Sequence, residues 1–326
     1  MSLTVGIRRG PCHITAQIGE VSWFDELKAM TTIQWVDPSG KREPLWPKPD
    51  AYQFPSASPD GSRIAVGVRG SSQDVWVYDL RRDIPTRLTF GGPAVGPRWS
   101  PNGLYVVFAV PGVGIFQARA DGASPPQLLL PRTQRYPMSF TPDGKRLAFW
   151  EYTPKGQIWT VPLEDQGAQL KAGTPEPFLE SNSSDSLPSF SPDGRWLAYT
   201  SDESGKSEVY VREFRPASSA QGPKVQISNS GGRKPEWSET AHDLMYQSGD
   251  QIMAASYRVN GDTFVPEKPR VWIAKFGGID WDLSPDGKRV VVLTPLESAG
   301  APARDHEVVF LLNFFDELRR RVPAKQ

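Results

Sequence analysis

The sequence predicts an all-β fold, and three observations support this prediction. The chain of 326 residues contains 29 glycines and 32 prolines, which destabilise the interior of a helix by about 1 and 3 kcal/mol each. A Ser-Pro-Asp-Gly turn recurs along the chain at intervals of 41 to 50 residues. Short runs of β-branched and aromatic residues follow each turn, and such runs between Gly/Pro turns are typical of β-strands.

The recurring turn is well preserved in five places, and its residue types predict a tight hairpin loop. The five copies occupy residues 58–61, 100–103, 141–144, 191–194 and 284–287. Proline presets φ at the first central position, Asp or Asn suits the second, and Gly accepts a positive φ. Two weaker copies, 238–241 and 16–19, extend the series to seven units of about 46 residues that fill the chain.

Every unit continues in the same order after its turn. A second apolar segment follows at once, as in 104–108 and 146–150. A third strand is expected to begin with a β-branched residue in each unit, and a fourth short segment ends the unit. The seven third-strand residues are Ile33, Val75, Ile115, Ile158, Val209, Ile252 and Val308.

Four antiparallel strands in each repeat predict the blades of a β-propeller, because a ring of blades covers both faces of every blade. We expect one domain over residues 1–326 with seven blades, six being the alternative because units one and six lack a clean turn. The expected repeats are 12–50, 51–93, 94–134, 135–184, 185–232, 233–277 and 278–326.

Closure of the ring requires a strand that joins the two ends of the chain. The expected last blade has a third strand at 308–314, but the tail that follows is too polar for a good fourth strand. Residues 3–8 are apolar at alternate positions, so we expect them to supply the outer strand of the last blade. The alternative is that residues 318–322 take this place.

Charge and motif content exclude several classes of function. The chain has 37 basic and 37 acidic residues, so no overall field attracts nucleic acid or an anionic membrane. A single cysteine, Cys12, excludes an internal disulfide framework, and the three histidines show no paired metal-ligand spacing. No signal peptide or membrane span is recognisable, and no catalytic motif is found. We expect a monomer without a cofactor or metal.

Loops on one face of a propeller are the expected place for binding, because the rigid blades hold them around the central channel. The segments that lead into the innermost strands combine Arg, Tyr and Trp, which are enriched at binding hot spots, with charges of both signs. The candidate mouth residues are Tyr52, Arg98, Arg135, Tyr136, Asp185, Arg233, Lys234, Asp280 and Trp281. They predict a mouth that holds a protein partner, an extended peptide or a small ligand; an ordinary polar rim is the alternative.

A carbohydrate-processing enzyme is the alternative from another class. Asp280 and Asp282 lie two residues apart on an expected strand, so both point to the same side. Their separation suits an acid/base pair of a glycosidase. However, Asp282 aligns by repeat with a column that is polar in every unit, which favours a structural role. The aligned residues are Ser56, Arg98, Ser139, Ser189 and Glu236.

The repeat resembles that of the TolB-like, WD-like propellers, over essentially the whole chain. The resemblance rests on the Ser-Pro-Asp-Gly turns, on segments such as 73–80 and 86–90, and on the closing segment 312–323. It is nearest to propellers found C-terminal to the kinase domain in some bacterial serine/threonine kinases. The chain itself has neither the His-Arg-Asp nor the Asp-Phe-Gly motif of a kinase.

This resemblance implies a non-catalytic module that binds a protein or ligand at one face of the ring. It also implies a sensor or scaffold that works outside the cytoplasm, such as the periplasmic part of a receptor-type kinase. A purely structural domain that needs its parent chain is a third alternative. Because one fold serves many functions, the motifs specify the architecture better than the activity.

Overall fold

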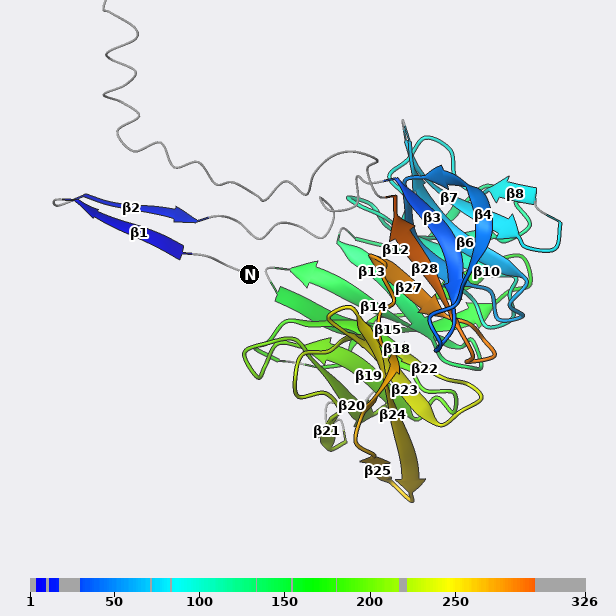
Figure 1. The fold of residues 1–326 in the computed structure, drawn as a ribbon. Coiled ribbons are helices and arrows are strands. Elements are labelled where there is room, and N and C mark those ends of the chain that lie inside the picture. Colours follow the sequence, from blue (N-terminus) through cyan, green and yellow to red (C-terminus); the bar gives the residue numbers. More distant parts are fainter. Residues whose placement is uncertain are drawn as a thin grey trace, which may run out of the picture. The chain divides into compact units, whose positions relative to one another are not determined.

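The described residues form six antiparallel sheets of four or five strands, which correspond to six propeller blades (Figure 1), and one separate two-stranded sheet. The structure is a computed structural model that describes residues 4–9, 12–17, 30–70, 72–82, 84–132, 134–153, 155–179, 181–216 and 222–296. No helix that could span a membrane occurs among these residues. We name five consecutive sheets blades I to V and the sixth the closing blade.

Blades I and II each contain four strands in chain order. Blade I consists of β5 (Tyr52–Ala57), β6 (Arg63–Arg69), β7 (Gln73–Asp79) and β8 (Ile84–Arg87). Blade II consists of β9 (Val95–Trp99), β10 (Tyr105–Val110), β11 (Gly114–Arg119) and β12 (Gln127–Pro131).

Blades III, IV and V follow the same plan, with an additional short strand in III and V. Blade III consists of β13 (Arg135–Phe140), β14 (Arg146–Thr153), β15 (Lys155–Asp165), β16 (Leu170–Ala172) and β17 (Glu176–Pro177). Blade IV consists of β18 (Asp185–Phe190), β19 (Trp196–Ser201), β20 (Glu208–Glu213) and β21 (Lys224–Gln226). Blade V consists of β22 (Arg233–Trp237), β23 (Asp243–Ser248), β24 (Gln251–Asn260), β25 (Thr263–Pro266) and β26 (Arg270–Ile273).

The closing blade combines strands from both ends of the propeller. It consists of β27 (Asp280–Leu283), β28 (Val290–Pro295), β3 (Thr31–Val36) and β4 (Arg42–Asp50). The orange strands β27 and β28 and the blue strands β3 and β4 in Figure 1 make up this one sheet. β28 and β3 pair along their whole length, from Val290 opposite Val36 to Pro295 opposite Thr31.

The expected seven blades were therefore wrong, and the alternative of six is the observed number. The first and last expected repeats, 12–50 and 278–326, each supply two strands of the same blade. Since β28 already pairs with β27 and β3, no edge of β28 is left for a third strand at Val308. Residue 308 and the alternative closing segment 318–322 lie outside the described residues.

The prediction that residues 3–8 form the outer strand of the last blade was also wrong. β1 (Thr4–Arg9) pairs with β2 (Cys12–Gln17) in a separate hairpin, and β4 occupies the outer position of the closing blade. The ring is closed instead by β3 and β4, which lie later in the chain.

The hydrophobic core consists of six clusters, each formed between two neighbouring blades. One cluster joins Val75 and Val77 of blade I to Trp99, Val106 and Phe108 of blade II. The other five clusters join II to III, III to IV, IV to V, V to the closing blade, and the closing blade to I. Six clusters between six blades close the ring. Burial of each large apolar side chain stabilises the fold by about 1.5–3 kcal/mol.

The repeated turn connects the first and second strands of its blade through a fixed set of hydrogen bonds. In the copy at 58–61, the Ser58 hydroxyl donates to Asp60 Oδ1 over 2.6 Å, and the Arg63 N–H donates to Ser58 Oγ over 2.9 Å. Gly61 adopts φ of 66°, and the glycines of the four other well-preserved turns lie between 66° and 71°. These contacts lower the pKa of Asp60 to about 2, chiefly through the hydrogen bond from Ser58.

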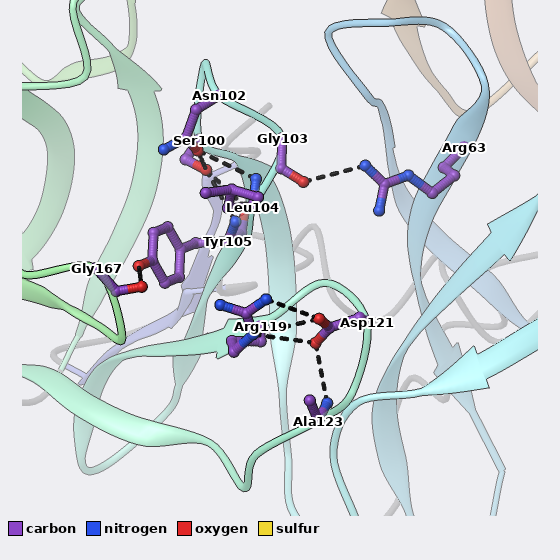
Figure 2. A network of polar contacts seen from close by, with 10 residues as sticks. All are labelled: Arg63, Ser100, Asn102, Gly103, Leu104, Tyr105, Arg119, Asp121, Ala123 and Gly167. Carbon is purple, nitrogen blue, oxygen red and sulfur yellow. Dashed lines mark hydrogen bonds and ion pairs between the residues drawn. The ribbon is translucent and has the colours of Figure 1, made fainter.

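The turn also links its blade to the neighbouring blades. Figure 2 shows the copy at 100–103, where Asn102 replaces Asp and accepts the Ser100 hydroxyl over 2.7 Å. Arg63 of blade I donates to the Gly103 carbonyl over 3.0 Å, and the Tyr105 hydroxyl donates to the Gly167 carbonyl of blade III over 3.1 Å. The turn and the residue that follows it therefore contact the neighbouring blades as well as stabilise the local hairpin.

We predict that Gly61→Ala lowers the free energy of unfolding by about 1 kcal/mol, because an L-residue at positive φ is strained. The added methyl group would meet only Pro285, at 3.8 Å, which is an ordinary contact. Urea unfolding of the variant measures the loss. Gly92→Ala is the control, since Gly92 has open space and no positive φ; an equal loss in both variants would contradict the explanation.

Candidate functional site

The first strand of each blade lies next to the first strands of the neighbouring blades. Direct contacts join β27 to β5, β5 to β9, β9 to β13, β13 to β18 and β18 to β22. We call these six strands the inner strands. We call the face where they begin the mouth face, and the opposite face, which carries the Ser-Pro-Asp-Gly turns, the turn face.

Five inner strands contain a β-bulge, and β27 pairs without one. In four of the five, a residue in the left-handed region directly precedes a proline: Phe54, Gly96, Leu187 and Lys234, with φ between 53° and 62°. Three of these four are not glycine, and each such residue costs on the order of 1 kcal/mol. A bulge changes the direction of the side chains that follow it, so in these strands it affects which residue faces the ring axis.

Two residues after the left-handed position in these four strands, and at the aligned positions of β13 and β27, lies a polar residue. We call these the axial positions. In ring order from the closing blade through blade V they are Asp282, Ser56, Arg98, Ser139, Ser189 and Glu236. Three are serine and three are charged, and the charged ones are half-buried.

The charged axial residues influence one another across the ring. Glu236 belongs to blade V and Arg98 to blade II, which stand three blades apart in a ring of six. The positive charge of Arg98 nevertheless favours the ionised form of Glu236, and the negative charge of Asp282 opposes it. Residues of opposite blades are close enough for this only near the axis, so these side chains converge in the central channel.

Several axial groups bind the next blade in the ring. Asp282 Oδ2 accepts the Ala57 N–H over 2.8 Å, and Ser139 Oγ accepts the Phe190 N–H over 3.0 Å. Arg98 Nε donates to the Met138 carbonyl over 3.1 Å. A serine and an aspartate thus perform the same structural task at equivalent positions, so a serine suffices for it.

Glu236 differs from these residues, because its carboxylate has no hydrogen bond or ion pair with any described residue. The pKa of Glu236 is raised to about 7, chiefly by burial and in second place by the neighbouring negative charge of Asp282. Burial also raises the pKa of Asp282. The two carboxylates lie on adjacent blades, so ionisation of one opposes ionisation of the other.

Two more predicted mouth residues, Lys234 and Asp280, complete this group. Lys234 Nζ donates to Asp280 Oδ1 and to the Trp281 carbonyl. Their charges also act on Glu236, Lys234 favouring the ionised form and Asp280 opposing it. The structure therefore brings three of the predicted residues, Arg98, Lys234 and Asp280, together with Glu236 and Asp282. We call these five residues the channel cluster.

Other predicted mouth residues are buried in the blades. Tyr52 is 1% exposed and donates its hydroxyl to the Lys48 carbonyl over 2.9 Å. Trp281 is fully buried against blade V. Asp185 is 3% exposed, accepts the Ser181 hydroxyl, and has a pKa raised by burial. A role of these side chains in binding remains a prediction, and burial gives a partner little access to them.

Arg135 is held in a buried ion pair within blade III. Its Nε donates to Glu151 Oε2 over 3.0 Å, and both side chains are about 5% exposed or less. The guanidinium also lies over the Phe149 ring at 5.0 Å. Of the remaining two residues, Tyr136 is half-buried with its ring 5.3 Å from that of Trp150, and Arg233 is half-exposed at the start of β22.

Glu236 and Asp282 were not among the predicted mouth residues. The signal was present, since both belong to the polar column that the repeat alignment gives. The sequence could not show that this column faces the axis, because the bulges that orient it depend on strand pairing. No group of His, Cys, Asp and Glu that could hold a metal ion occurs in the described part of the chain.

A groove of 620 Å³ opens on the turn face between blades II and III. Its carboxylates are already occupied: Asp165 accepts the Tyr105 hydroxyl over 3.1 Å, and Asp143 accepts the Thr141 hydroxyl over 2.7 Å. The groove therefore presents less unsatisfied charge than the channel, and we take the channel as the candidate site.

We predict that Arg135→Ala lowers the free energy of unfolding by about 3–5 kcal/mol, because Glu151 would keep a buried charge without its main partner. Chemical denaturation measures this loss. Arg119→Ala is the control, since the Arg119–Asp121 pair is solvent-exposed on blade II and such pairs contribute at most about 1 kcal/mol. Similar losses in both variants would contradict the explanation that burial of the Arg135–Glu151 pair causes the larger loss.

We predict that Glu236 makes the protein less stable as the pH rises. A carboxyl with a pKa raised from 4.5 to about 7 in the folded state binds its proton more tightly there than in the unfolded chain. The contribution of Glu236 to the free energy of unfolding therefore falls by on the order of 3 kcal/mol as the pH rises from 4.5 to 7. Glu236→Gln should remove this fall, as measured by urea unfolding at pH 5 and pH 8.

The difference between the two proteins isolates Glu236, since every other group is the same in both. Exposed Glu239→Gln should keep the pH dependence of the unchanged protein. An equal fall in the Glu236→Gln variant would contradict the prediction.

Comparisons with known proteins support the fold. No family model matches the chain. An uncharacterised protein of Agrobacterium fabrum is 28% identical over 156 residues, which cover 44% of this chain and about half, 52%, of that protein.

Solved structures similar to this chain include TolB-like β-propellers. A protein assigned as TolB in Agrobacterium tumefaciens has a TM-score of 0.63 at 17% identity, over 83% of this chain and 99% of its own. TolB from Acinetobacter baumannii has a TM-score of 0.52 at 16% identity, over 82% of this chain and 64% of its own. A protein assigned as a 6-phosphogluconolactonase in Bacteroides uniformis has a TM-score of 0.53 at 13% identity, over 83% and 94%. At these identities the likeness concerns the fold.

Proposed function

We propose that the chain is a non-catalytic binding propeller that holds a protein or peptide partner at the mouth of its central channel. The observation that carries the proposal is the channel cluster, where charges from blade II, blade V and the closing blade converge on the axis. Its supports are the sequence resemblance and the structural likeness to TolB-like propellers. A place in a receptor-type kinase outside the cytoplasm is part of the same proposal.

The internal symmetry of the ring supports this function for the cluster. Serine at Ser139 makes the contact to the next blade that Asp282 makes, so folding alone needs no charge at the axial positions. Charged residues at three of the six axial positions are therefore not explained by folding alone. Buried charges that lack full pairing reduce stability, and such groups concentrate at functional sites.

One observation favours the alternative of a carbohydrate-processing enzyme, namely the adjacent Glu236 and Asp282 with their raised pKa values. A pair of that kind could supply an acid and a base. The surroundings favour binding instead, because Asp282 is tied to the Ala57 N–H and Asp280 is paired with Lys234. We therefore retain binding as the proposed function.

We predict that the double variant Arg98→Ser, Glu236→Ser loses its partner but keeps its fold, because serine occupies the same position in three blades. The experiment is affinity capture from envelope and cytosolic extracts of the bacterium that makes the protein, with identification by mass spectrometry. The control is Arg258→Ser, Glu267→Ser, which removes one charge of each sign from an exposed ion pair on blade V.

A partner retained by the unchanged protein and the control but not by the axial variant is the expected result. Equal retention by all three proteins would place the binding surface elsewhere. Thermal unfolding of each variant verifies that loss of capture does not reflect loss of the fold.

A further inference from the structure

The carboxylate of Glu236 is the feature of the channel that the fold leaves unexplained. Asp282 accepts the Ala57 N–H, and Arg98 donates to the Met138 and Pro97 carbonyls. Glu236 makes no hydrogen bond or ion pair within the described part of the chain, although it is half-buried and burial disfavours its charge. A side chain that contributes so little to folding and is directed into the channel is suited to receive a group from outside.

The charges that face Glu236 come from three elements. Asp280 and Asp282 lie on β27, Lys234 lies on β22, and Arg98 lies on β9. Both cations are already engaged, Lys234 with Asp280 and the Trp281 carbonyl, and Arg98 with two backbone carbonyls. When Glu236 and Asp282 are both ionised, the two cations and three carboxylates leave one negative charge in excess, which one entering cation would neutralise.

Resting on the proposed function, we infer that the channel binds one primary ammonium group of its partner between Glu236 and Asp282. An ammonium is a compact charge with three donors, which oxygen atoms from different blades can share. The neighbouring axial residues, Ser56 beside Asp282 and Ser189 beside Glu236, are serines whose oxygens can accept further donors. A lysine side chain or the free amino terminus of a peptide carries the required group.

Binding of an ammonium group is coupled to a proton. The pKa of Glu236 is raised to about 7 by burial and by Asp282. Without a ligand, the Glu236 carboxyl is therefore protonated in a large fraction of the molecules at neutral pH. The entering cation favours the ionised carboxylate, so the proton leaves to solvent as the ammonium enters. Affinity should therefore rise with pH up to about 7 and level off above it.

The test uses n-butylammonium chloride as the probe and ligand-observed NMR titration of the full chain at pH 6 and pH 8. We expect at least several-fold tighter binding at pH 8. Glu236→Gln should weaken binding about tenfold or more at pH 8 and abolish its pH dependence. Glu267→Gln, on the exposed pair with Arg258, should behave like the unchanged protein. Butanol and butyrate should bind weakly at both pH values.

Three results would overturn the inference: equal binding by the Glu236→Gln variant, no change with pH, or tighter binding of butyrate or butylguanidinium than of butylammonium. Gln resembles the protonated carboxyl, so this variant should fold. Asp282→Ser is the second variant, since serine accepts the equivalent N–H at Ser139, and it should also weaken the probe.

The outcome is separable from that of the proposed function. Partner capture that depends on the axial residues, without butylammonium binding, would remove the ammonium inference and leave the proposed function in place. If butylammonium binds as expected but no captured partner depends on the axial residues, the ammonium site stands and the proposed binding of a protein or peptide partner is removed.

Discussion

The pairing of β28 with β3 is the constraint on which the other blades depend. A four-stranded blade has two apolar faces, and it is stable only when a neighbour covers each of them. Blades I and V obtain their second neighbour from the closing blade, whose strands come from residues 31–50 and 280–295. Six backbone pairs from Val290 to Pro295 thus close a core that extends around the entire ring.

This constraint also explains how far the fold could be predicted. The five well-preserved turns, 58–61, 100–103, 141–144, 191–194 and 284–287, were predicted correctly because each depends on a few consecutive residues. The same holds for the third strands that contain Val75, Ile115, Ile158, Val209 and Ile252. The number of blades was not predicted correctly, because it depends on whether two incomplete repeats at opposite ends pair with each other. Ile33 was correctly placed on a third strand, but its first and second strands lie about 250 residues further along the chain.

The candidate site was predictable to a smaller extent, for a related reason. Arg135 looked like a mouth residue because nothing near it in the sequence marks its buried partner, Glu151, sixteen residues later. Arg98, Lys234 and Asp280, which the repeat pointed to, lie in the channel cluster, and their role in binding stays a prediction. Glu236 belongs to the same polar column of the repeat alignment. It differs from the other charged residues in having no hydrogen bond or ion pair with a described residue, which only the folded structure shows.

The sixfold repetition provides an internal reference for what the axial position requires. Serine in three blades satisfies the geometry, and at Ser139 it also makes the bond to the next blade. The charges are confined to three positions, with Asp282 and Glu236 on adjacent blades and Arg98 three blades from Glu236. This distribution makes the channel electrically asymmetric, although the whole chain is neutral.

Such an asymmetry has a structural consequence for any partner. A ligand on the axis of a symmetric channel could rotate freely, whereas this channel offers acceptors on one side and a cation on the other. Because the cations are held by Asp280 and by backbone carbonyls, they cannot move to neutralise Glu236 without breaking bonds between blades. The ring therefore keeps an unpartnered carboxyl near its centre, and a positively charged group that enters the channel would be oriented by the same contacts that hold the blades together.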